Sequence, residues 1–179
     1  MDDKKIYKIL QHWFPLLKNA EIPKKKYRKN FSDFLQWIKE ENFATLLYMM
    51  KMQPDCLFEN EMEQSAVLQD FQIDLTVLKD NIAAKADPIL AYFEQHKAVI
   101  GRYYDVNEQI LDIVLEEVLT VAEQIDYQLL LVYAEAYYWL LVPNDEAKIE
   151  KFCKSFNQQF KDHNILIEHY ERYVCSRST

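Results

Sequence analysis

Glycine is nearly missing from this chain. Gly101 is the single glycine among 179 residues, where average usage would place about a dozen. Tight β-hairpins and phosphate-binding loops depend on glycine for positive φ angles. The composition therefore argues against P-loops, GxGxxG turns and GxSxG nucleophile elbows. It favours helices joined by turns of proline, asparagine and aspartate.

Paired cysteines and long apolar runs are also lacking. The three cysteines, Cys56, Cys153 and Cys175, form no CxxC pair, so neither a disulfide framework nor a zinc site is indicated. The longest apolar run, residues 129–142, contains Glu135 and is shorter than the roughly 20 helical residues that cross a bilayer. The first residues lack the pattern of a signal peptide. We expect a cytoplasmic protein with no membrane span and no metal or other cofactor.

The pattern of apolar residues predicts the fold class. Half of the residues are hydrophobic and 28% are charged, which is typical of a globular protein. Apolar residues recur at helical spacing, as in Phe31, Phe34, Leu35 and Ile38. We therefore predict an all-α, single-domain bundle of about six to eight helices over residues 1–179. The expected helices cover residues 3–18 with a break near Pro15, 30–40, 43–53, 59–71, 74–86, 88–100, 105–142 with a bend allowed near Asp126, and 144–160.

Several of these helices have recognisable ends. A side-chain oxygen just before a helix can accept hydrogen bonds from its first free backbone N–H groups. Gly101 is expected to supply a left-handed C-terminal cap. The expected N-terminal caps are Asn30, Asp74, Asp105, and Asn144 or Asp145.

The charge of −8 is distributed unevenly along the chain. Residues 1–53 hold 11 Lys and Arg against 6 Asp and Glu, whereas residues 54–179 hold 10 against 23. The interval between Arg102 and Lys148 contains ten carboxylates and no Lys or Arg. The expected single domain thus has a basic N-terminal part and an acidic remainder.

Positive charge is concentrated in one short segment, PKKKYRKN, in which five of eight residues are cationic. Its residues could contact phosphates, with the tyrosine stacking on a base. They could also contact a protein or lipid headgroup, but a solvated linker is the favoured interpretation. A helix-turn-helix is disfavoured, because the helix expected over residues 43–53 is too apolar to read bases. This basic stretch comprises Lys24, Lys25, Lys26, Tyr27, Arg28 and Lys29.

The acidic counterpart is a row of carboxylates on the helix expected from residue 105. At 100° per residue, six carboxylates fall within an arc of roughly 80°, apart from the apolar face. The row is either solvated, neutralised by the basic stretch, or a docking surface for a basic partner. A metal site is disfavoured because histidine support is absent. This acidic ridge comprises Asp105, Glu108, Asp112, Glu116, Glu123 and Asp126.

A third candidate is the aromatic segment YAEAYYW. Its acid, Glu135, has only apolar neighbours in residues 129–142, so we expect it to be buried and paired; a pocket acid and an exposed side chain are the alternatives. The aromatic residues are typical of core, and also of a groove for a peptide helix. This possible pocket comprises Glu135, Tyr133, Tyr137, Tyr138 and Trp139.

No catalytic residue is assigned from the sequence. Glu168, His169 and Glu171 could form an acid–base cluster, but an exposed helix end is the favoured interpretation. Cys153 lies on an apolar helix face, which indicates a buried structural thiol.

The function predicted from these features is non-enzymatic binding of another protein through a charged docking surface. An adaptor, a dedicated chaperone, an immunity-like protein and a regulator all fit. One alternative is a nucleic-acid-associated regulator that uses the basic stretch, or the acidic ridge as a phosphate mimic. A further alternative is a helical ligand-binding protein or enzyme with a pocket near Glu135. The oligomeric state is not predicted.

Overall fold

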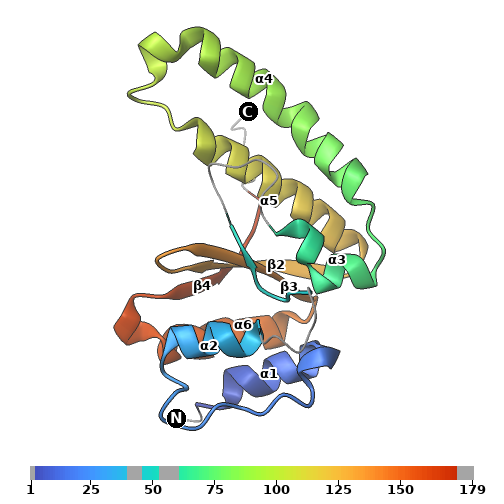
Figure 1. Ribbon diagram of the computed structural model, residues 1–179, viewed down its shortest axis with the longest axis vertical. Coiled ribbons are helices and arrows are strands. Elements are labelled where there is room, and N and C mark those ends of the chain that lie inside the picture. The colour runs from blue at the N-terminus through green and yellow to red at the C-terminus, as the bar shows by residue number, and fades with distance from the viewer. Residues whose placement is uncertain (1–2, 40–45, 53–60, 173–179) are drawn as a thin grey trace, which may run out of the picture.

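The fold is mixed rather than all-α. The computed structural model describes residues 3–39, 46–52 and 61–172, which form six α-helices and one four-stranded antiparallel sheet. With 58% helix and 14% strand, the prediction of an all-α helical bundle is wrong. Figure 1 shows the sheet in the middle of the molecule, with α4 and α5 on one side and α1, α2 and α6 on the other. None of the described helices has the length and apolar content needed to cross a membrane.

Most of the strands come late in the chain, after the first five helices. The strand order in the sheet is β1-β3-β2-β4. Short 3₁₀ turns cover Pro15–Leu17, Met62–Gln64 and Lys161–His163. The helices and strands are α1 (Lys5–Trp13), α2 (Phe31–Ile38), β1 (Met50–Lys51), α3 (Ala66–Asp70), α4 (Leu75–Ile100), α5 (Val106–Gln124), β2 (Tyr127–Tyr133), β3 (Tyr137–Pro143), α6 (Glu146–Gln159) and β4 (Leu166–His169).

The largest correction concerns the helix expected over residues 105–142. Only α5 is helical; the chain then turns at Asp126, which has a φ of 60°, and continues as the β2–β3 hairpin. Both strands are buried on both faces at their centres, from Leu129 to Val132 and from Trp139 to Val142. A strand covered on both faces is a continuous apolar run, which periodicity cannot distinguish from a buried helix.

The scarcity of glycine did not prevent a hairpin. The residues with positive φ in the described ranges are Glu61, Gln72, Asp126 and Asn164, so the three-residue turn 134–136 lies outside that region. Ala134 N–H donates to the Ala136 carbonyl across the turn, at 3.2 Å. This loop therefore closes the hairpin without the positive φ angles that a two-residue turn requires. The argument from missing glycine therefore excluded only the tightest hairpins.

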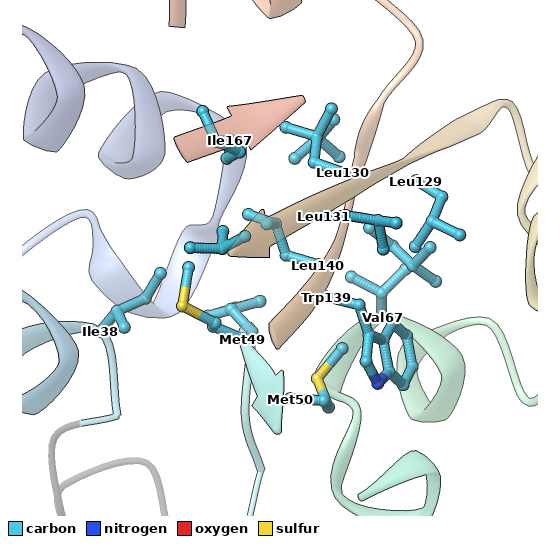
Figure 2. Close-up of a cluster of buried hydrophobic side chains, with 14 of the residues drawn as sticks. Ile38, Met49, Met50, Val67, Leu129, Leu130, Leu131, Trp139, Leu140 and Ile167 are labelled. Atoms are coloured by element: carbon cyan, nitrogen blue, oxygen red, sulfur yellow. The ribbon is translucent and has the colours of Figure 1, made fainter. Parts of the chain in front are cut away.

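The two faces of the sheet form two halves of the core. Leu131 pairs with Trp139, and this face meets Val67 of α3, whereas Leu130 pairs with Leu140 on the opposite face. Figure 2 shows Trp139 beside Met50 and Val67, with Leu140 and Ile38 on the other side of the strands. Below that second face, aromatic rings join the helices, as in Phe34–Phe156 with centroids 5.5 Å apart and Trp13–Phe152 at 5.1 Å.

Other expected helix boundaries are partly right. The N-terminal caps Asn30, Asp74, Asp105 and Asp145 are confirmed, since each side chain accepts a backbone N–H of the following helix. The two helices expected over residues 74–86 and 88–100 are one helix, α4, with Pro88 inside it. Gly101 follows α4 with a φ of −62°, so the expected left-handed cap is wrong.

Two further segments are strands where helix was expected. In residues 43–53, Met50–Lys51 form β1, while residues 43–45 and 53 lie outside the described ranges. Near the C-terminus, β4 replaces the expected exposed helix end, and it pairs with β2. In each case hydrogen bonds to a distant strand determine the conformation.

Both edges of the sheet are capped by side chains. On β4, the Asn157 amide group accepts from Ile167 N–H at 2.7 Å and donates to the Ile167 carbonyl at 3.0 Å. On β1, the Lys51 N–H donates to a carboxylate oxygen of Glu61 at 2.5 Å. These bonds occupy backbone groups through which a further strand could pair with the sheet.

Candidate functional site: an acidic cleft lined by tyrosines

A cleft of about 1050 Å³ lies between α5, the tip of the β2–β3 hairpin and the end of β4. It brings together two sets of residues that are separate in the sequence: the first half of the acidic ridge and the tyrosines of the aromatic segment. The segment 168–172 adds two more carboxylates. Its charged and tyrosine lining residues are Asp105, Glu108, Asp112, Tyr133, Tyr137, Tyr138, Glu168, His169, Tyr170, Glu171 and Arg172.

The sheet register positions the tyrosine side of the cleft. Tyr133 pairs with Tyr137 across the hairpin, and Glu168 of β4 is paired with Leu131, so all of them share the face that carries Trp139. The Tyr133 hydroxyl donates to Glu168 Oε1 at 2.6 Å. The Tyr133 and Tyr137 ring centroids are 5.6 Å apart, with the planes at 72°. Burial, followed by the bond to Glu168, raises the pKa of the Tyr133 hydroxyl, which keeps it a donor at neutral pH.

The helix α5 provides the opposite, acidic wall. Glu108, Asp112 and Glu116 follow one another at four-residue spacing on one helix face. Partial desolvation and the nearby Glu108 and Glu116 carboxylates raise the pKa of Asp112. In residues 3–39, 46–52 and 61–172, no ion pair reaches any of these three side chains. This half of the ridge therefore has no local counter-charge.

The remaining ridge residues have structural partners. Asp105 caps α5 by accepting from the Asn107 and Glu108 N–H groups. Asp126 Oδ1 accepts from Asn144 Nδ2 at 3.0 Å. The ridge thus has hydrogen-bonded or ion-paired residues at its two ends and an uncompensated centre.

Arg172 is the one cation among the lining residues that the structure describes, and it is directed to the second half of α5. Its guanidinium is 2.8 Å from Glu123 Oε2 and donates to Thr120 Oγ1 at 2.8 Å. His169 Nε2 lies 3.0 Å from Gln128 Oε1. Neither group neutralises the carboxylates of Glu108 and Asp112.

Two members of the expected pocket lie elsewhere. Glu135 is exposed in the hairpin turn, so the expectation that it is buried and paired is wrong. Trp139 is 2% exposed and belongs to the core. Tyr138 lines the rim of the cleft, and its ring contacts Phe31 at a centroid distance of 6.1 Å on the other face of the sheet. Tyr133 and Tyr137 are the aromatic residues that face the acidic wall.

The basic stretch lies on the opposite side of the sheet, in the loop before α2 (Figure 1). Lys24, Lys25, Lys26 and Lys29 are exposed, and Lys26 Nζ lies 4.5 Å above the Tyr27 ring. In the described part of the chain, no ion pair connects this stretch with the acidic ridge. The interpretation that the two neutralise each other within one molecule is not supported.

Arg28 differs from its lysine neighbours. It is 8% exposed, pairs with Asp3 at 2.8 Å, and donates from Nε to the Pro23 carbonyl at 2.6 Å. Its own carbonyl accepts from Gln159 Nε2 at 2.6 Å. This residue therefore holds the loop against α1 and α6, and four lysines and Tyr27 remain for outside contacts.

The described residues offer little for metal or thiol chemistry. They contain no group of three or more His, Cys, Asp or Glu side chains placed to hold a metal ion. Cys153 is half-buried, and burial raises the pKa of its thiol to about 11. The thiol is therefore protonated at neutral pH and a poor nucleophile.

Sequence reasoning missed that Glu168 belongs to the cleft. A weak signal was present: buried Ile165 and Ile167 alternate with exposed Leu166 and Glu168, which is the period of a strand. Comparison with protein families, curated proteins and solved structures finds no match for this chain. The function is therefore argued from the cleft itself.

Proposed function

We propose that this protein binds another protein, without catalysing a reaction, by receiving a basic segment of its partner in the acidic cleft. The observation that carries the proposal is the meeting of α5 carboxylates, hairpin tyrosines and Glu168 around one concave surface. An adaptor, a dedicated chaperone, an immunity-like protein and a regulator all work in this way. The proposal places the protein in the cytoplasm, because its cysteines lack a pairing pattern.

The electrostatics favour a cationic partner. Like charges at four-residue spacing destabilise a helix by about 0.2–0.5 kcal/mol per pair, and Glu108, Asp112 and Glu116 form two such pairs. A partner that supplies lysine or arginine relieves this repulsion when it binds. A concave surface of one charge also focuses its field and accelerates association with an oppositely charged protein.

The tyrosines favour a protein as the partner. Tyrosine combines a large apolar ring with a polar hydroxyl and loses little conformational entropy, so it is enriched at protein interfaces. Tyr137 is 44% exposed although it lies at the end of a buried hairpin. A partner can therefore contact the Tyr137 ring and the carboxylates of the cleft at the same time.

The test is affinity capture from native host extract, with and without nuclease. The cleft variant carries Glu108→Lys and Asp112→Lys. The matched control carries Glu146→Lys and Glu150→Lys, an exposed pair with the same spacing on α6 and the same change in net charge. We expect the wild type and the control to capture one stoichiometric protein that survives nuclease, and the cleft variant to bind it at least about tenfold more weakly.

Two results would contradict the proposal. Equal capture by the cleft variant would show that the cleft is not the docking surface. Loss of the captured protein on nuclease treatment would show that nucleic acid mediates the contact, which the basic stretch could provide. A bait with Lys24, Lys25, Lys26 and Lys29 changed to serine identifies that second case.

A further inference from the structure

We infer that the cleft contains a subsite for one arginine side chain of the partner, formed by Glu168 and Tyr137. The inference rests on the proposed function and specifies the chemistry of the basic segment. Arginine is distinguished from lysine by its planar guanidinium, which pairs with carboxylates through two parallel hydrogen bonds and stacks on aromatic rings. Both kinds of partner line the cleft, with Glu168 and Tyr137 each in contact with Tyr133 between them.

Only one oxygen of the Glu168 carboxylate is hydrogen-bonded to another described residue. Its Oε1 accepts from the Tyr133 hydroxyl at 2.6 Å. Among the residues that the structure describes, no hydrogen bond or ion pair reaches Oε2. A carboxylate oxygen can accept more than one hydrogen bond, so Oε1 also retains capacity. The group is thus oriented by its neighbour and still available to a forked donor.

Tyr137 provides aromatic surface on the same face of the sheet as this carboxylate, on the other side of Tyr133. It is paired with Tyr133 across the hairpin, and the two rings lie nearly perpendicular, at 72°. At 44% exposure, the Tyr137 ring is accessible from the cleft. A guanidinium over a tyrosine ring is attracted by the negative face of the ring, and this attraction persists at exposed sites.

The chain itself shows how an arginine fits between these elements. Arg172, just after β4, reaches α5 and contacts Glu123 and Thr120, both at 2.8 Å. The carboxylates of Glu108 and Asp112, nearer the start of α5, have no such arginine in the described part of the chain. An arginine from a partner would repeat this arrangement beside the first half of α5.

The partner segment is held by its side chains rather than as an added strand. The outward backbone groups of Ile167 on β4 are occupied by the Asn157 amide. The nearest sheet edge is therefore closed to strand addition. Recognition consequently depends on the charge and shape of side chains that enter the cleft.

The experiment uses three synthetic peptides that differ at one central residue. Each has a glycine-serine backbone with two flanking lysines, and the centre is arginine, lysine or citrulline, the neutral analogue of arginine. Binding to the full chain is followed by chemical shifts in ¹H–¹⁵N spectra. We expect the arginine peptide to bind about five- to tenfold more tightly than the lysine peptide, with the citrulline peptide weakest and shifts centred on Tyr137 and Glu168.

Variants test the two assigned residues separately. Glu168→Gln is expected to abolish the preference for arginine, and Tyr137→Leu to reduce it to about twofold. Tyr103→Leu is the control, because Tyr103 is 89% exposed and lies outside the cleft. Native-like spectra of the free variants show that they are folded.

The outcomes separate this inference from the proposed function. Equal binding of the arginine and lysine peptides, lost in the Glu108→Lys, Asp112→Lys variant, would overturn the arginine subsite and support the acidic cleft. An arginine preference that persists in Glu168→Gln would overturn the assignment of the residue. Both proposals fail if no peptide shifts the resonances of cleft residues and if the cleft variant captures the native partner as well as the wild type does.

Discussion

Two acidic residues of α5, Glu117 and Asp112, have opposite surroundings. Glu117 is 6% exposed and pairs with Lys85 of α4, so it joins the two helices. Asp112 is exposed beside two other carboxylates. Arg28 and Lys24 differ in the same way within the basic stretch. At this scale, a buried and paired charge supports the fold, and an uncompensated charge on the surface remains available for binding.

The first prediction concerns Asp112→Asn. Partial desolvation, followed by the neighbouring carboxylates, raises the pKa of Asp112 in the folded protein above its unfolded value, so its ionised form destabilises the fold. This cost to the free energy of unfolding is fully present at pH values above the pKa of folded Asp112. It disappears at pH values below the pKa of an unfolded aspartate, about 3.9. We expect the variant to be more stable at pH 7 by about 0.4–1 kcal/mol, the cost of two like-charge pairs on an exposed helix face.

Urea denaturation between pH 7 and pH 4 measures this effect. The gain should shrink as the pH falls toward 4, because the wild-type carboxyl becomes protonated. Glu150→Gln on α6 is the control. A destabilised Asp112→Asn protein at pH 7, or a gain that does not depend on pH, would contradict the argument.

At the scale of elements, the β2–β3 hairpin and the edges of the sheet decide the architecture. The hairpin is apolar on both faces because helices cover it on both sides. β4 is short, and α6 lies along it, with Asn157 bonded to Ile167 in place of another strand. A single amide side chain thus terminates the sheet.

The second prediction is that Asn157→Leu destabilises the protein and promotes self-association. The substitution leaves the Ile167 N–H and carbonyl without their partner, which costs about 1–3 kcal/mol. It also opens the edge of β4 to another chain. Urea denaturation and sedimentation velocity measure the two effects. Gln158→Leu adds the same apolar surface at an exposed neighbouring position and should change neither.

At the scale of the whole molecule, the sheet separates the basic stretch from the acidic cleft. The exposed lysines of the basic stretch lie on the α2 side of the sheet and the acidic cleft on the α5 side. The α4–α5 pair extends beyond the sheet as an arm (Figure 1). The buried residues of α4 are Leu78, Ile82 and Ala86, all in its first half. Among the described elements, α5 is the main packing partner of α4.

The third prediction is a gradient of local stability along this arm. Amide hydrogens of residues 88–100 should exchange at least about tenfold faster than those of β2 and β3, because few buried contacts hold that part of α4. Hydrogen exchange followed by mass spectrometry measures the difference. Equal protection in the arm and the sheet would show that the arm unfolds only with the rest of the molecule.

The sequence by itself determined the features that depend on near neighbours. The caps Asn30, Asp74, Asp105 and Asp145 act over two or three residues, and the single acidic face of α5 follows from helical spacing. The charge asymmetry is a property of composition. The acidic wall and the tyrosines of the candidate site were accordingly predictable, as two separate features.

Only the tertiary structure decided how distant segments combine. Residues 129–142 contain an apolar run that fits either a buried helix or a hairpin covered on both faces. The hairpin forms because β2 pairs with β4 and because α5 covers one face of the sheet. The same pairing brings Glu168 to Tyr133 and opposite Asp112. Burial through contacts with Asp3 and Gln159 likewise removed Arg28 from the surface. These interactions join residues far apart in the chain, and local periodicity carries no information about them.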